Sequence, residues 1–115
     1  MIDAWLSKFK QAWINNDIEA VLTLFSEDVE YWETPYKKLA GFSDLASEWQ
    51  AIHTQSDIQL DLRVFSSITG KHTVRWELRY KKENGEVQQW AGTYLIRLDE
   101  SGLCNYFYQV GEKRS

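Results

Sequence analysis

Glu33 is the acidic residue whose place in the sequence best suits acid-base chemistry. It ends a short segment from Val29 that we predict to be a strand, and Pro35 stops that segment because proline restricts the residue before it. A carboxyl group at the mouth of an apolar hollow has a raised pKa and can transfer protons. A solvated side chain at a strand end would fit the same pattern, so both interpretations stay open.

His53 and Tyr94 could assist such a carboxyl group. His53 lies one turn after Trp49 on a predicted helix, so we expect the two side chains to share a face. Histidine donates or accepts protons near neutral pH, although at a helix end it is often a cap or a surface group. Tyr94 lies in the middle of a predicted strand, where its hydroxyl could orient a ligand. An enzyme would need Glu33, His53 and Tyr94 to converge on one point.

Large aromatic residues are unusually frequent, with six tryptophans and six tyrosines in 115 residues. Such rings suit the walls of a pocket for a flat organic ligand. The candidates are Trp13, Tyr31, Trp49, Trp76, Trp90, Tyr94, Tyr106 and Tyr108. Strand alternation prevents all of them from facing inward, and any one could belong to the core or to a subunit interface.

Several site classes lack their sequence signature. The two histidines, His53 and His72, belong to different predicted elements and have no partner at ligand spacing, so we expect no metal. A single Cys104 excludes an internal disulfide and fits a reducing compartment. There is no Gly-x-Ser-x-Gly elbow and no glycine-rich phosphate loop, and we expect no cofactor.

Charge and hydropathy indicate a cytoplasmic protein that binds neither nucleic acid nor membranes. The net charge is -4, and the lysines and arginines are dispersed among acidic residues, so no basic surface forms. No apolar run reaches about 20 residues, and the start of the chain does not resemble a signal peptide. The length suits one domain, residues 1–115.

Helical spacing of apolar residues dominates the first half of the chain. It predicts a helix from Ile2 to Trp13, then a short helix that Asp17 caps and that carries Ile18 to Phe25. A loop after Pro35 leads to a third helix, which begins near Ser43 and Asp44 and reaches about His53.

The second half alternates apolar and polar residues with a period of two. This predicts strands at 58–65, 74–81, 87–98 and 103–110, with a tight hairpin at Asn84-Gly85. Helices followed by a strand meander predict an α+β fold, in which a curved antiparallel sheet carries three helices on its concave face. We expect a conical hollow between the two layers.

The order of these elements, together with several short motifs, resembles the SnoaL-like branch of the nuclear transport factor 2-like superfamily. The resemblance covers nearly the whole chain. Its motifs are Phe9-x-x-x-Trp13, Asn16-Asp17, Leu24-Phe25-Ser26-Glu27-Asp28-Val29, Thr34-Pro35, Gly41, Trp49, Trp76, Trp90-Ala91-Gly92-Thr93-Tyr94, Arg97-Leu98-Asp99 and Gly102. It implies a cone-shaped α+β roll but no single activity, since the superfamily includes isomerases, cyclases, hydrolases and binding proteins.

The catalytic groups of two of these classes are missing from the matching positions. Ketosteroid isomerases of the superfamily use a tyrosine, an aspartate and a further acid, where this sequence has Phe9, Thr34 and Tyr94. We therefore expect no ketosteroid isomerase activity. Polyketide cyclases place an aspartate on a strand facing the pocket, and residues 87–98 contain no acid.

Three functional hypotheses remain. The first is a protein that binds a small apolar or cyclic molecule in an aromatic pocket. The second is an acid-base enzyme, such as an isomerase, cyclase or hydrolase. The third is a dimeric interaction module without a ligand. The resemblance also implies a homodimer, because in this superfamily a second subunit often covers the outer face of the sheet.

Overall fold

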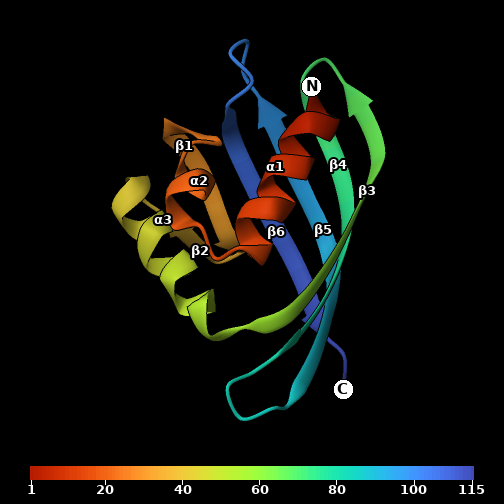
Figure 1. Ribbon diagram of the computed structural model, residues 1–115. Coiled ribbons are helices and arrows are strands. Elements are labelled where there is room, and N and C mark those ends of the chain that lie inside the picture. The colour runs from red at the N-terminus through yellow and green to blue at the C-terminus, as the bar shows by residue number, and fades with distance from the viewer.

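The structure, a computed structural model, describes all 115 residues and has a mixed α+β fold. Its helices are α1 (Ile2–Ile14), α2 (Ile18–Leu22) and α3 (Gly41–Gln50), the last continuing into a short 3-10 helix, η1 (Ala51–Thr54). Figure 1 shows the helices on one face of a strongly curved sheet, with α1 lying across the strands. The predicted α+β fold with three helices is confirmed.

Six strands form one sheet in the order β2-β1-β6-β5-β4-β3. Their bounds are β1 (Phe25–Thr34), β2 (Lys37–Leu39), β3 (Ser56–Ile68), β4 (Lys71–Lys81), β5 (Val87–Leu98) and β6 (Cys104–Lys113). The pairs are antiparallel except β1 with β6, which is parallel. The C-terminal meander is as predicted, but the parallel pairing of β1 with β6 was not predicted. Parallel pairing requires a long connection between the two strands, and the segment from β2 to β5 provides it.

Element boundaries in the first half differ from the sequence-based prediction. The second helix ends at Leu22, and Phe25 already belongs to β1, which starts four residues earlier than expected. The segment after Pro35 was expected to be a loop, but Lys37–Leu39 pairs with β1 as the short strand β2. The cap on the second helix is as predicted, since the Ala20 amide donates to Asp17 Oδ1 over 3.1 Å.

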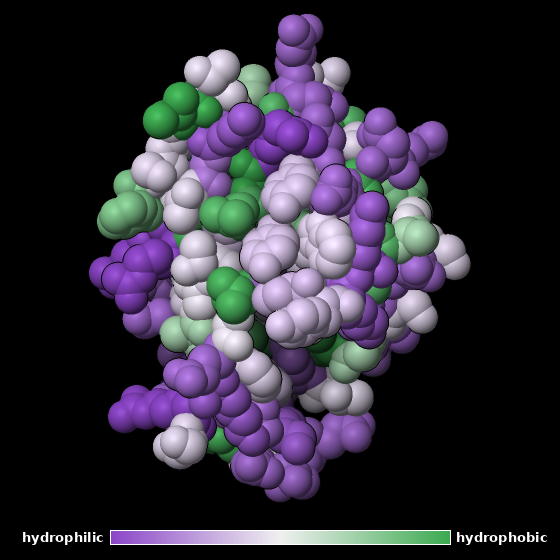
Figure 2. Space-filling view, turned by 180° about the vertical axis from the view of Figure 1, so that it is seen from behind, coloured by the Kyte–Doolittle hydropathy of each residue, from purple (hydrophilic) through white to green (hydrophobic).

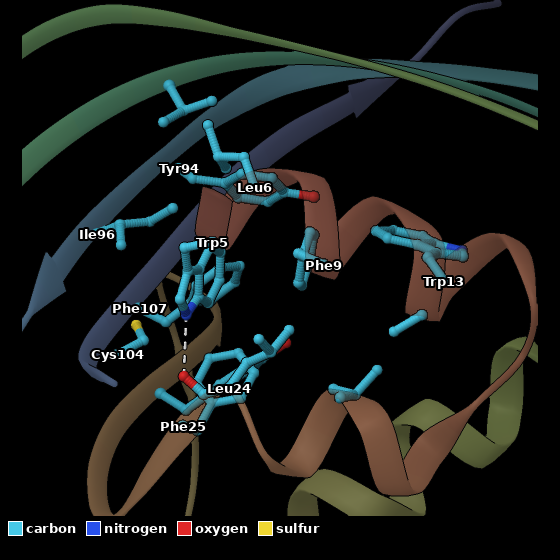
Figure 3. Packing of buried hydrophobic residues seen from close by; sticks show 14 of the residues in the cluster. Trp5, Leu6, Phe9, Trp13, Leu24, Phe25, Tyr94, Ile96, Cys104 and Phe107 are labelled. Atoms are coloured by element: carbon cyan, nitrogen blue, oxygen red, sulfur yellow. Dashed lines mark hydrogen bonds between the residues drawn. The ribbon is translucent and has the colours of Figure 1, made fainter. Parts of the chain in front are cut away.

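The core fills the space between the helices and the concave face of the sheet. In Figure 3, Trp5 and Phe9 of α1 point toward Tyr94 of β5 and Phe107 of β6. Trp5 and Phe9 stack with ring centroids 5.2 Å apart, and Phe9 meets Tyr94 edge to face at 5.8 Å. Trp5 Nε1 also donates to the Leu24 carbonyl over 2.9 Å. Aromatic packing therefore occupies much of the interior that the sequence led us to expect as a hollow.

The predicted alternation of the strands is confirmed on β5. Tyr94, Ile96 and Leu98 are buried, and Trp90 packs partly buried against the same core. The residues between them, such as Leu95, are exposed on the outer face. This alternation decides which candidate side chains reach the interior.

Candidate functional site

Glu33 lies near the end of β1 with its side chain on the inner face of the sheet. Tyr31, two residues earlier on the strand and on the same face, is buried, while Glu33 is half-buried. Gln109 of β6 donates from Nε2 to Glu33 Oε1 over 3.3 Å and to the Glu33 carbonyl over 3.1 Å. The carboxyl group is therefore held between the rim and the interior by a neutral donor.

The surroundings raise the pKa of Glu33 to about 7. Burial is the largest cause, because it penalises the charged form, and the carboxylate of Glu48 on α3 adds to it. Lys37 on β2 acts in the opposite direction but is bound to Glu48. A carboxyl group with such a pKa exchanges its proton at neutral pH, which suits a general acid or base.

Tyr94 lies in the same interior region as Glu33. It stands opposite Gln109 in the register of β5 and β6, and Gln109 in turn contacts Glu33. Tyr94 is fully buried, and its hydroxyl has no hydrogen-bond partner. Burial, followed by the charge of Glu33, raises its pKa far above the usual range, so the phenol stays protonated. A buried hydroxyl without a partner is costly and is a candidate ligand contact.

Trp76 of β4 carries the second buried polar group without a partner, its indole Nε1. Its ring stacks on Tyr94 with centroids 5.4 Å apart. The ring lies over Gly92 and Gly111, which face each other on β5 and β6; a Cβ there would stand 2.8 Å and 2.5 Å from the ring, respectively. The two glycines thus leave the space that the indole occupies.

Trp13 and Trp49 line the helical side of this interior. Their rings are 5.0 Å apart, and both meet Phe9 edge to face. Trp13 Nε1 donates to Gln55 Oε1 over 3.1 Å, just beyond η1. The structure therefore brings the predicted residues Trp13, Trp49 and Trp76 together with Tyr31 and Tyr94 in one core.

Three predicted site residues lie elsewhere. His53 is exposed on η1, whereas Trp49 is buried, so the expectation that they share a face is wrong. The helix tightens from α to 3-10 geometry after Gln50, and this rotates His53 away from Trp49. Tyr108 is half-buried and pairs with Trp32 on the outer face, because it alternates with the buried Phe107.

Trp90 lies outside the closed interior, at an open groove of about 860 Å³. Ile14, Ile58, Leu60 and Leu78 bound this groove on the concave side, together with Lys10 of α1. Other lining residues, such as Gln59 and Glu77, alternate to the outer face. Trp90 Nε1 and the Tyr80 hydroxyl both donate to the buried Gln88 Oε1, over 3.2 Å and 3.0 Å. Leu78, which lines the groove, is the next inward-facing residue after Trp76 on β4. The groove therefore lies beside Trp76.

Gln109 is the site residue that sequence reasoning missed. The alternation on β6 points Gln109 to the same face as the buried Phe107, and this signal was present in the sequence. Gln109 was not among the predicted site residues because a neutral amide neither titrates nor binds metals strongly. No cluster of three His, Cys, Asp or Glu residues could hold a metal ion, and no helix has the length and hydropathy to cross a membrane.

A family model described as a SnoaL-like domain matches residues 6–106. The chain belongs to the SnoaL-like family. A comparison with curated proteins gives no match. This SnoaL-like chain resembles solved structures of low sequence identity, and these support the fold alone.

Three of these structures illustrate the range of the fold. A nuclear transport factor 2-like protein of unknown function from Exiguobacterium is 20% identical, with a TM-score of 0.78 over 94% of this chain and 98% of its own. A Δ5-3-ketosteroid isomerase from Mycobacterium is 17% identical, with a TM-score of 0.82 over 96% of each chain. A Mycobacterium tuberculosis protein in complex with estradiol-17beta-hemisuccinate is 14% identical, with a TM-score of 0.80 over 92% and 89%.

Proposed function

We propose that this SnoaL-like protein binds a small cyclic, mostly apolar molecule in the aromatic interior between α1, α3 and the sheet. The observation that carries the proposal is that two of the three buried side-chain polar atoms without partners, the Tyr94 hydroxyl and Trp76 Nε1, lie together in this interior; the third is Asn16 Oδ1. Native proteins rarely leave such groups unsatisfied, and a ligand with a hydrogen-bond acceptor would satisfy them. One structural relative is a complex with a steroid ester, which supports a binding role for the fold.

The route into this interior is the groove beside Trp90. Its volume lies within the usual range for ligand pockets, about 300–1,000 Å³, and apolar side chains such as Leu60 and Leu78 line it together with charged ones such as Lys10. Trp76 occupies the space between the groove and Tyr94, above the two glycines. Rotation of this one side chain would open the groove toward the Tyr94 hydroxyl and would carry Trp76 Nε1 with it.

A matched pair of tyrosine variants tests the proposal. Flat cyclic ketones are titrated while tryptophan fluorescence is recorded, since Trp13, Trp49 and Trp76 surround the interior. We expect saturable binding that Tyr94→Phe weakens about three- to tenfold through loss of one hydrogen bond. The control, Tyr108→Phe, changes a hydroxyl on the outer face and should leave the affinity unchanged. Equal effects of the two variants would contradict an interior site.

Acid-base catalysis is the second candidate, and the pKa of Glu33 near 7 favours it. In this version Glu33 transfers the proton and Tyr94 donates a hydrogen bond to the substrate; His53, exposed on η1, takes no part. Glu33→Gln separates the two candidates once a ligand is known. An enzyme loses turnover in this variant while it still binds its substrate, whereas a binding protein shows no turnover in either form.

A homodimer through the outer face of the sheet completes the proposal. Figure 2 views this face, where weakly polar and apolar side chains gather in the middle with hydrophilic ones around them. Leu95 and Val110 are 40% and 45% exposed there, beside Tyr106 and Tyr108. Patches of this kind favour association. Light scattering at micromolar concentrations should give the mass of a dimer. Leu95→Lys should give monomers, whereas the control Gln59→Lys, on the edge strand β3, should stay dimeric. A monomeric wild-type protein would contradict the dimer.

A further inference from the structure

The carboxyl group of Glu33 has no cationic partner in the protein. Its hydrogen bond comes from the neutral amide of Gln109, and none of the ion pairs of the chain includes it. Lys37 is the cation that lowers the pKa of Glu33, but it is exposed and paired with Glu48. A buried or half-buried carboxylate is normally paired, because removing its charge from water is costly.

The groups around Glu33 make its surroundings more negative. The carboxylate of Glu48 on α3 and the phenols of Tyr31 and Tyr94 interact electrostatically with Glu33, and Tyr31 lies on the same face of β1. Neither phenol supplies positive charge. Aromatic rings carry negative potential on their faces, so they attract cations and repel anions. A carboxylate among such rings is a common arrangement for recognising an ammonium group.

The free hydrogen-bond acceptors around Glu33 also fit a ligand that donates hydrogen bonds. Gln109 occupies one oxygen of the carboxyl group, Oε1, and no protein group donates to the other. The Tyr94 hydroxyl can accept as well as donate, and it has no partner. Glu33 is half-buried next to the exposed Thr34, so solvent reaches it from the rim.

We propose that the ligand of this site carries a protonated amine, which pairs with the Glu33 carboxylate while its ring lies among the aromatic side chains of the interior. This inference rests on the proposed binding function and adds the charge of the ligand. The site then selects cyclic amines over neutral analogues of the same shape and rejects anionic ones.

Three compounds that share one ring and differ in charge test this directly. Isothermal titration calorimetry at pH 8 compares 2-naphthylmethylamine, 2-naphthylmethanol and 2-naphthoate with the wild-type protein. We expect the amine to bind at least tenfold more tightly than the alcohol and the carboxylate to bind most weakly. Glu33→Gln should bring the amine and the alcohol within about twofold of each other. The matched control, Glu27→Gln, removes an exposed carboxylate from the same strand and should keep the preference.

The pH dependence supplies a second measurement that does not need a variant. Burial and Glu48 raise the pKa of Glu33 to about 7, with Lys37 opposing and Tyr31 and Tyr94 uncharged in this range. The carboxylate fraction therefore falls about tenfold from pH 8 to pH 6. Affinity for the amine should fall about tenfold over that interval, while affinity for the alcohol stays constant.

The outcomes separate this inference from the proposed function. If the alcohol or the carboxylate binds as tightly as the amine, the cationic ligand is wrong and the binding site stands. If amine affinity rises toward pH 6, Glu33 acts as a proton donor and the inference is again wrong. If none of the three compounds binds, both the inference and the binding function fail for this class of ring.

Discussion

Neutralising Glu33 should stabilise the protein at alkaline pH. The pKa of this residue rises from 4.5 to about 7 on folding, mainly through burial. Each unit corresponds to about 1.4 kcal/mol, and partial solvent screening of a half-buried group lowers the sum to about 2 kcal/mol. Glu33→Gln keeps the shape of the side chain and removes this cost, so at pH 8 it should unfold about 5–10 °C above the wild type.

The sign of the pH dependence follows from proton binding. Between pH 4.5 and 7 the folded state holds more protons at Glu33 than the unfolded state. Wild-type stability should therefore fall as the pH rises through this interval and level off above it. The variant cannot titrate at this position, so the two proteins should have nearly equal stability at pH 4.5 and differ most at pH 8.

Thermal unfolding followed by circular dichroism at pH 4.5, 6 and 8 measures this difference. Glu27→Gln is the control, because it removes an exposed carboxylate from the same strand, β1, and it should give no such gain. A constant difference between Glu33→Gln and the wild type at all three pH values would refute a buried, uncompensated carboxyl group at Glu33.

Three further predictions follow from other parts of the fold. Gly111→Ala would place a Cβ 2.5 Å from the Trp76 ring and should destabilise the protein by about 1–3 kcal/mol, and adding Trp76→Leu should recover part of that loss in the same unfolding assay. Asp17→Ala removes the cap on the Ala20 amide and should cost about 1 kcal/mol in urea unfolding. Burial raises the pKa of the Cys104 thiol to about 12, so a thiol reagent at pH 8 should label it only after unfolding.

The long, strongly periodic segments of the chain could be predicted from sequence because their patterns leave one interpretation. The helix from Ile2 and the strands β4 and β5 are of this kind. The short strand β2 has no such pattern: Lys37–Leu39 contains two lysines, and only pairing with β1 orders it as a strand. The change from α to 3-10 geometry after Gln50 could not be predicted either, because no change in hydropathy marks it.

The candidate site was predicted in part. Glu33 and Tyr94 were selected from their places in the strands, and the structure puts them in one region through Gln109. Pairing between distant strands, which no local pattern encodes, is what makes Gln109 their link. The same limit applies to Trp76, whose position depends on two glycines in other strands.

The end of β1 and the facing side of α1 decide which polar groups reach this interior. Strand alternation makes Glu33, and not the proline-adjacent Thr34, share the inner face with Tyr31; Thr34 is exposed. On the opposite wall, α1 presents the ring of Phe9 to Tyr94 and offers its hydroxyl no hydrogen bond. The half-buried Glu33 therefore lies at the rim of the interior, and the Tyr94 hydroxyl and Trp76 Nε1 have no acceptor in the protein. This arrangement supplies contacts for a ligand that brings its own polar group more readily than it supplies an aligned acid and base.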